Sequence, residues 1–268
     1  MNRKITALVL SAFVLGALSV RAQTPVPTPI PVAPGSSWTF TSAFVSQYML
    51  RGVRRGGPSF EPNLEFGSGA LALGLWTNFP IKDKVAGQSD PEFEPYGSYT
   101  FDLVKDRLTL QPEFILYAYP NAKKSDGFYL ATFEPSLAFN WMPADGCKFT
   151  PKIYRDVVLK QTLFEFNAAF NLPLNDVGIE LDFLGTIGTF KATDALEDTS
   201  PAAKNWGNYW LLGVTVPFQV VKDTQKLLLG LAYTKGSDNF LKQGTRPQSV
   251  NPGAVGRGVV TVSYAITF

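Results

Sequence analysis

The chain has 268 residues, of which 45% are hydrophobic, 13% aromatic and only 17% charged, and its formal net charge is +2. A charge this close to zero argues against nucleic acid as a partner. The sequence contains no histidine and a single cysteine, which excludes Ser-His-Asp and Cys-His catalysis, histidine-based metal sites and an internal disulfide. We therefore predict that the protein is not an enzyme and has no catalytic residue, cofactor or metal site.

Residues 1–22 have the pattern of a cleaved secretory signal peptide. Arg3 and Lys4 precede an apolar stretch that ends at Leu18, and Val20-Arg21-Ala22 offers small residues for cleavage. The apolar stretch is shorter than the ~20 residues that a membrane-spanning helix needs. Residues 23–37, which include the proline-rich run TPVPTPIPVAP, are predicted to form an extended periplasmic leader.

From residue 38 onward, apolar and polar side chains alternate in segments separated by turn-forming residues. Alternation with a period of two is typical of β-strands that have two different faces. The expected strands are residues 38–51, 59–67, 70–79, 92–103, 108–119, 128–141, 148–156, 163–172, 177–190, 205–216, 226–235 and 258–268. The tenth and eleventh segments are apolar on both faces, so their facing stays open. We predict an all-β fold, a single antiparallel up-and-down transmembrane β-barrel of about 12 strands over residues 38–268.

The last segment shows the pattern most clearly. Val260, Val262 and Tyr264 share one face with the terminal Phe268, whereas the opposite face carries small residues such as Thr261. Its length matches the roughly 9–11 residues of a tilted membrane-spanning strand. A soluble sandwich strand would show the same alternation, so this segment needs support from the rest of the chain.

Connector lengths provide that support. Tight links are expected at residues 67–69, 105–106, 143–146 and 175–176, and a somewhat longer one at 219–225. Residues 80–90, 191–204 and 236–255 instead form long polar loops. Short turns on one rim and long loops on the other are typical of outer-membrane barrels. An even strand count places both termini on the short-turn rim, which we predict to be periplasmic. The short link at 157–162 breaks this pattern.

One face of most segments is bulky and uncharged across its middle, while the other face carries carboxylates. Because a charge at the bilayer midplane costs about 2–4 kcal/mol for Arg or Lys, the uncharged face should meet lipid. The predicted pore-lining residues are Arg51, Glu61, Glu65, Trp76, Glu94, Glu113, Glu134, Lys152, Glu165, Glu180 and Asp182. The aromatic residues expected at the membrane interfaces are Trp38, Tyr48, Phe79, Tyr99, Trp141 and Tyr264.

The amino-terminal third carries two motifs of a known family. The run Ser46-Gln-Tyr48-Met-Leu-Arg51-Gly52 is similar to the first-strand Tyr-x-x-Arg-Gly signature of the TorF-family porins, and Gly74-Leu-Trp76-Thr-Asn78 is similar to their Gly-x-Trp-x-Asn strand. Glu94 resembles the acidic residues on the family's later strands. Where the family often has Gln soon after Arg-Gly, this chain has Arg54-Arg55. The resemblance covers about the first 100 residues and implies a small outer-membrane barrel with a pore, but no particular solute.

Acidic residues exceed basic ones on the predicted lumen face, so a water-filled lumen would concentrate cations. We therefore predict a porin for passive diffusion of small hydrophilic solutes or cations, located in the outer membrane of a Gram-negative bacterium. Outer-membrane lipid and lipopolysaccharide are the expected surroundings, and Arg51, Arg54 and Arg55 are candidates for contact with lipopolysaccharide. The sequence leaves association into homo-oligomers open.

Alternatives stay open at this point. Twelve strands lie between barrels of about 8 strands, which side chains fill, and barrels of 16, which leave a channel. The lumen is therefore either a narrow pore or nearly dry, with Arg51 and Lys152 pairing with carboxylates. A non-conducting structural or adhesive barrel would act through its long loops instead. Calcium binding by Asp194, Glu197 and Asp198 is a further alternative to a solvated loop.

Overall fold

The computed structural model describes residues 35–84, 90–122, 130–174, 179–191, 206–240 and 250–268. The regular secondary structure of these residues consists of β-strands only. The described residues contain no helix that could span a membrane. The strands are β1 (Ser36–Val45), β2 (Tyr48–Leu50), β3 (Val53–Gly56), β4 (Ser59–Ser68), β5 (Leu71–Pro80), β6 (Glu92–Tyr99), β7 (Phe101–Val104), β8 (Leu108–Ala118), β9 (Ala131–Ala144), β10 (Cys147–Arg155), β11 (Thr162–Leu174), β12 (Ile179–Lys191), β13 (Trp206–Val221), β14 (Gln225–Gly236) and β15 (Arg257–Thr267).

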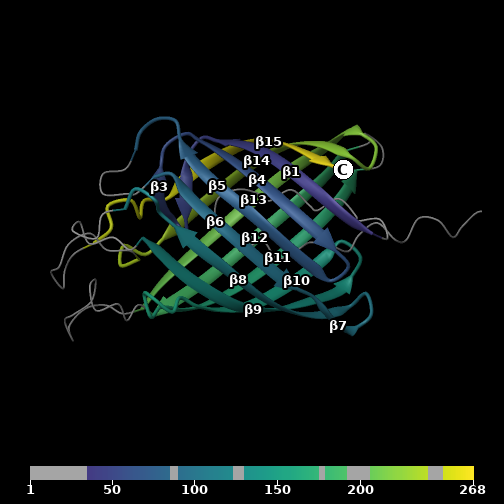
Figure 1. The fold of residues 1–268 in the computed structure, drawn as a ribbon, viewed down its shortest axis with the longest axis horizontal. Coiled ribbons are helices and arrows are strands. Elements are labelled where there is room, and N and C mark those ends of the chain that lie inside the picture. The colour runs from purple at the N-terminus through teal and green to yellow at the C-terminus, as the bar shows by residue number, and fades with distance from the viewer. Residues whose placement is uncertain (1–34, 85–89, 123–129, 175–178, 192–205, 241–249) are drawn as a thin grey trace, which may run out of the picture.

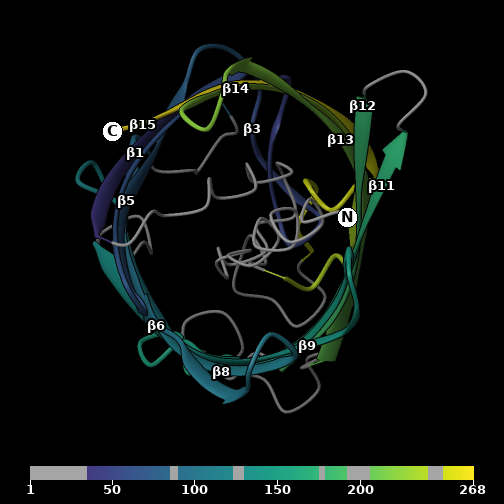
Figure 2. The same ribbon diagram turned by 90° about the vertical axis from the view of Figure 1, so that its right-hand side faces the viewer.

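These strands form a closed antiparallel barrel of 12 strands (Figure 1), which confirms the predicted fold class. β1 pairs with β15, so the first and last strands lie side by side, and the pairing of β6 with β8 completes the ring. β7 continues β6 beyond Thr100 and pairs with β8. β2 and β3 form a separate two-stranded sheet, the β2–β3 hairpin, which lies inside the ring (Figure 2).

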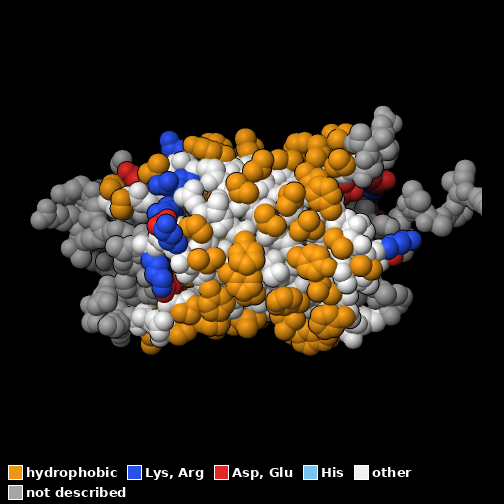
Figure 3. Space-filling view, turned by 90° about the horizontal axis from the view of Figure 1, so that it is seen from above, with side chains coloured by type: hydrophobic (Ala, Val, Ile, Leu, Met, Phe, Trp, Pro, Cys, Tyr) orange, Lys and Arg blue, Asp and Glu red, His pale blue; other side chains and the backbone are white. Residues whose placement is uncertain are grey.

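Side-chain alternation divides the wall into two faces, as expected for a strand period of two. On β15, Val260 and Val262 are 51% and 44% exposed on the outer face, whereas Thr261 and Ser263 are buried on the inner face. The same register assigns the previously open tenth and eleventh segments: Trp210 and Leu231 point outward, Tyr209 and Ala232 inward. On the side of the barrel seen in Figure 3, hydrophobic and uncharged side chains cover the middle, and charged side chains gather toward the two ends.

The short turns lie on the rim where β1 begins and β15 ends. Gly69, Asp106, Gly146 and Asp223 adopt positive φ angles of 56°, 59°, 73° and 62° in the turns that follow β4, β7, β9 and β13. Such backbone geometry is available at low cost to Gly and, to a lesser extent, to Asp. The predicted turn at 175–176 and most of the loop at 191–204 lie outside the described residues, as do Asp194, Glu197 and Asp198.

The first expected strand, residues 38–51, is wrong beyond Val45. The wall strand β1 ends there, and the chain turns inward at Ser46 and Gln47 to form the hairpin. Tyr48, which we expected at the membrane interface, is only 3% exposed, and Leu50 is only 5% exposed. Tyr48 is therefore not part of an interfacial girdle, whereas Trp38, Phe79, Tyr99 and Trp141 are exposed on the outer surface and Tyr264 is half-buried there.

Candidate functional site

The β2–β3 hairpin lies in the lumen at the end of the barrel that carries the long loops. Its turn is formed by Arg51 and Gly52, whose φ angles are 50° and 75°. Positive φ at both central residues is characteristic of the tight turn that joins two short antiparallel strands. Arg51, the last residue of the first expected strand, thus lies with Gly52 at the tip of an inward hairpin.

Hydrophobic side chains hold the hairpin against the opposite wall. Leu50 and Val53 pack in one buried cluster with Tyr154, Leu163, Phe190, Tyr209 and Phe240. These partners come from β10, β11, β12, β13 and the segment after β14. On the other side Met49 packs against Val45 and Val259, and the backbone nitrogen of Arg54 donates to the carbonyl of Gly253 at 2.8 Å. The hairpin and the ends of the β14–β15 loop therefore pack together inside the barrel.

Arg51 is held at the hairpin tip by a bidentate ion pair. Its two terminal nitrogens donate to the two carboxylate oxygens of Glu134 on β9, at 3.0 and 2.6 Å. The side chains of Arg51 and Glu134 are only 6% and 2% exposed. Burial by itself lowers the pKa of Arg51, but the charge and hydrogen bond of Glu134, together with Tyr117 and Tyr209, outweigh this effect, and the pKa lies well above its ordinary value. The guanidinium is therefore permanently charged at this position.

The rest of the Arg51 surroundings is aromatic. The guanidinium carbon lies 5.2 Å from the ring centre of Tyr154 and 5.9 Å from that of Phe240, both within the range of cation–π attraction. The hydroxyl of Tyr117 donates to Glu134 at 3.2 Å. We call Glu134, Tyr117, Tyr154 and Phe240 the Arg51 cage.

Two further carboxylates near the hairpin accept hydrogen bonds from tyrosines. Tyr154 donates to Glu165 on β11 at 2.7 Å, and Tyr209 donates to its other oxygen. The ring of Tyr209 fits because its cross-strand partner is Gly188, where a Cβ would come within 2.1 Å of the tyrosine ring. A phenol donates a hydrogen bond to a carboxylate oxygen but brings no positive charge to it.

Glu92 on β6 forms the matching arrangement at the root of the hairpin. Tyr48 and Tyr119 donate to its two oxygens at 2.7 and 2.8 Å. Burial raises the pKa of Tyr48 well above its ordinary value, and the charge of Glu92 adds to the rise. The hydroxyl of Tyr48 therefore stays protonated and can keep donating. The hairpin is thus anchored to the wall at its root as well as at its tip.

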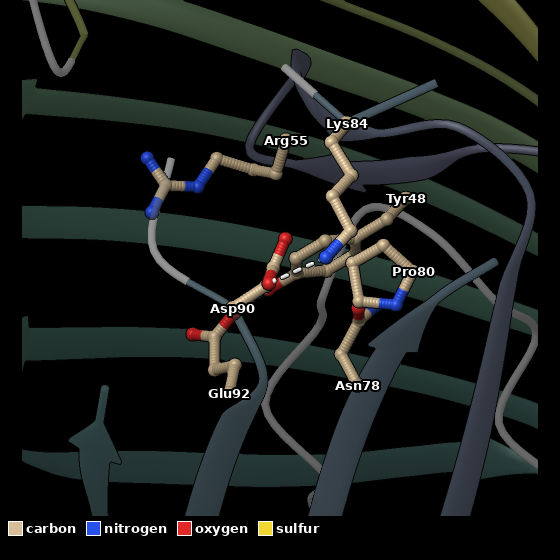
Figure 4. A pocket seen from close by; sticks show the side chains of 7 residues that line it. All are labelled: Tyr48, Arg55, Asn78, Pro80, Lys84, Asp90 and Glu92. Carbon is tan, nitrogen blue, oxygen red and sulfur yellow. Dashed lines mark hydrogen bonds and ion pairs between the residues drawn. The ribbon is translucent and has the colours of Figure 1, made fainter. Parts of the chain in front are cut away.

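A small pocket opens beside this root (Figure 4). It is lined by Tyr48, Arg55, Asn78, Pro80, Lys84, Asp90 and Glu92. Lys84 points toward Asp90 and donates to it at 2.9 Å. Arg55 and Arg54, expected as contacts for lipopolysaccharide, are half-buried on β3 inside the barrel, and Arg51 is buried. The expected outer-rim contact is therefore wrong for Arg51, because its side chain is buried in the cage.

Deeper in the lumen, polar side chains link both neighbouring strands and strands that are not neighbours. Lys152 on β10 forms a buried ion pair with Glu113 on β8, across the intervening β9. Nearer the short-turn rim, the side-chain amide of Asn140 on β9 donates to Thr109 and Gln111 on β8 at 3.1 Å each. Both predicted lumen cations, Arg51 and Lys152, therefore pair with carboxylates. This pairing is the one expected for a nearly dry lumen, one of the two alternatives given by the sequence.

The structure places all the predicted pore-lining residues on the inner side of the barrel. Arg51 comes from the hairpin rather than from a wall strand. Glu61, Glu94, Glu113, Glu134, Lys152 and Glu165 are buried, and Glu65, Trp76, Glu180 and Asp182 are half-buried. Glu65 accepts from Tyr96 at 2.8 Å, and Asp182 accepts from Asn171 at 2.6 Å. That these side chains line an open pore is a proposal, which is taken up below.

Sequence reasoning missed the tyrosines that hold the carboxylates. Alternation does put Tyr117 and Tyr154 on the inner face with Glu113 and Lys152, and this was the available signal. Nothing in the pattern indicated Tyr209, whose segment is apolar on both faces, or Phe240, which lies in a loop. Among the described residues, no group of His, Cys, Asp and Glu is arranged to hold a metal ion.

Sequence comparisons give no match: no protein-family model matches the chain, and no curated protein matches it. Membership in the TorF family therefore stays a prediction. Solved structures do match. The NanC porin aligns with a TM-score of 0.52 at 9% identity, over 85% of this chain and 98% of that one. The KdgM porin aligns with a TM-score of 0.50 at 9% identity, over 86% and 99%.

A third similar structure is the COG4313 outer membrane channel from Pseudomonas putida F1, with a TM-score of 0.52 at 12% identity, over 90% of this chain and 99% of that one. Each of these barrels is matched along almost its whole length. At such low identity the likeness concerns the fold alone. The chain therefore has the fold of an outer-membrane β-barrel.

Proposed function

We propose that the protein is an outer-membrane porin that allows small hydrophilic solutes, and cations in particular, to diffuse through its lumen. The observation that carries this proposal is the closed barrel with carboxylates on its inner face and an uncharged outer belt. The similar solved structures are a porin, a second porin and an outer-membrane channel, which supports transport rather than catalysis.

We infer that the lumen carries a net negative charge, because its inward carboxylates outnumber its inward cations even when Arg54, Arg55 and Lys148 are counted. Arg51 and Lys152 are matched by Glu134 and Glu113. Glu65, Glu92 and Glu165 accept hydrogen bonds from tyrosines, which bring no positive charge to these carboxylates. Carboxylates that face a narrow aqueous path attract cations and repel anions.

A planar bilayer experiment with refolded residues 23–268 tests the proposal. We expect discrete conductance steps, and a reversal potential in a KCl gradient that indicates preference for potassium. The double variant Glu65→Gln, Glu165→Gln should lower this preference. The matched control is Asp145→Asn, because the Asp145 side chain is 79% exposed on a turn and should leave selectivity unchanged. Equal selectivity in all three proteins would contradict the proposal.

The inward hairpin favours a second candidate, a non-conducting barrel that acts through its loops. Leu50, Val53 and Phe240 fill part of the loop-side lumen, and this filling narrows any passage. On this view no conductance is seen even after the hairpin is loosened, and trimming residues 191–204 or 236–255 abolishes adhesion to a surface or ligand. The conductance of a hairpin variant therefore separates the two functions.

For orientation, we propose that the rim with both termini and the short turns faces the periplasm and the long loops face outward. The signal peptide and proline-rich leader predicted for residues 1–37 support this arrangement. An epitope inserted in residues 192–205 should then be labelled on intact cells, whereas one placed after Gln23 should be labelled only after the outer membrane is permeabilised. The reverse result would overturn the orientation.

A further inference from the structure

The Arg51 cage has the composition of a binding site for a guanidinium group. A carboxylate accepts two parallel N–H bonds in the fork geometry that suits a guanidinium. Two aromatic rings, those of Tyr154 and Phe240, lie within cation–π distance of the same group. The site is buried, since Glu134 is only 2% exposed. It is therefore a formed receptor whose occupant belongs to the chain itself.

The occupant is carried by a small element. The hairpin consists of β2, with three residues, and β3, with four, joined by the Arg51-Gly52 turn. It is attached to the wall through β1 and β4, so Arg51 is a tethered ligand at the end of a short arm. The four cage residues belong to β8, β9, β10 and the segment after β14, and none belongs to the hairpin. Truncating the Arg51 side chain therefore removes the occupant without removing any cage residue.

The charge around the cage exceeds what Arg51 neutralises. Glu134 pairs directly with Arg51. Glu165 accepts a hydrogen bond from the hydroxyl of Tyr154, whose ring covers the guanidinium. Asp156, two residues after Tyr154, is also buried. Burial raises the pKa of Asp156, and the negative charge of Glu134 raises it further. Lys152 lies over Tyr154 as well, but it pairs with Glu113. A cation is therefore favoured at this position once Arg51 is absent and Glu134 has no partner of opposite charge.

We propose that the Arg51 cage is a recognition site for small solutes that carry a guanidinium group, and that Arg51 occupies it as an internal mimic of such a solute. As a site for a permeating solute, it rests on the porin function proposed above. A guanidinium-bearing solute competes with the hairpin tip for Glu134. Neutral solutes and anions lack this interaction, so the cage sets which solutes are retained at the loop end of the lumen.

The test uses methylguanidinium as the probe and methylurea as its neutral counterpart of nearly equal shape. Calorimetric titration of the refolded Arg51→Ala variant in detergent should show saturable binding of methylguanidinium and none of methylurea. Binding to the wild-type protein should be at least about ten-fold weaker because Arg51 fills the site, and the double variant R51A, E134Q should also lose about ten-fold, as expected for charged hydrogen bonds. Equal binding to R51A and to R51A, E134Q would overturn the proposal.

Folding itself supplies a second readout if R51A refolds poorly. Methylguanidinium in the refolding buffer should then raise the folded yield of R51A, but not that of R51A, E134Q. An unchanged yield for both would also count against the cage. Binding is measured without any current, so a barrel that binds methylguanidinium but never conducts contradicts the porin function alone. A conducting barrel that fails to bind contradicts only the recognition site.

Discussion

Gly52 at the hairpin tip packs directly against Gly236 at the end of β14. A Cβ atom built on Gly52 would lie 2.1 Å from the backbone nitrogen of Gly236, and the φ of Gly52 is +75°. The hairpin can therefore approach the wall this closely only because neither residue carries a side chain at the contact. A glycine-to-alanine substitution at Gly52 therefore tests whether the hairpin must lie this close to the wall.

Gly52→Ala should displace the hairpin tip from the wall. The alanine meets backbone atoms that cannot give way, and the left-handed conformation adds roughly 1–2 kcal/mol of strain. We expect a larger single-channel conductance than in the wild type. Gly56→Ala is the control, since the nearest atom to its Cβ would be 3.5 Å away. Unchanged conductance in Gly52→Ala would show that the hairpin does not limit the passage.

Glu134→Gln should lower the free energy of unfolding by about 3–5 kcal/mol, because it leaves the buried Arg51 without its counter-charge. Urea titration of the protein in lipid vesicles measures this change. Exchanging the two charges in the double variant R51E, E134R should recover part of the loss. Asp145→Asn breaks the exposed pair with Arg107, whose nearest N–O distance is 3.7 Å, and should change stability by only about 0–1 kcal/mol.

Tyr154→Phe and Tyr209→Phe each remove one phenol donor from Glu165. A hydrogen bond to a charged group contributes about 1.5–3 kcal/mol, so each variant should unfold at a lower urea concentration. Because both phenols serve one carboxylate, the double variant should deviate from the sum of the two losses. Tyr233→Phe is the comparison, since Tyr233 is 44% exposed on the outer face and should have almost no effect. Strict additivity would argue against a shared role at Glu165.

Leu229→Lys places a cation on the outer face in the middle of β14 and should destabilise the barrel in a bilayer by about 2–4 kcal/mol. Tyr233→Lys lies two residues before Lys235, the exposed cation at the loop end of the same strand, and should cost only about 0–1 kcal/mol. Unfolding titrations in vesicles measure both values. Equal costs for the two lysines would argue against a lipid belt around the middle of the wall.

The sequence was sufficient to predict the wall of the barrel, because lipid on one side and side chains on the other impose an alternation that can be counted. It failed at residues 46–51, where Tyr48 and Leu50 continue the alternation of β1 although they point into the protein. Only the Arg51-Gly52 turn distinguishes an inward hairpin from a longer strand. The break at Thr100 between β6 and β7 was missed for the same reason, since Tyr99 and Phe101 continue one face.

The pairings inside the lumen were beyond the reach of alternation. Periodicity places Glu113 and Lys152 on the same face, but their ion pair crosses β9 and joins residues 39 positions apart. Which carboxylate meets which cation depends on the curvature of the closed wall. The position of Arg51 depends in addition on the β2–β3 hairpin, which the alternation of the wall strands does not indicate. The set of inner residues was therefore predictable, whereas their partners were not.

The seam between β1 and β15 has a consequence for how the protein reaches its final state. Trp38 and Phe268 exchange two backbone hydrogen bonds of 2.9 Å each, so residues from opposite ends of the barrel sequence must meet before the cylinder can shut. Contacts of such large sequence separation form late and slowly. Until they form, both edge strands expose unpaired backbone groups that hydrocarbon cannot satisfy. Insertion of this chain into a bilayer is therefore coupled to the joining of its first and last strands.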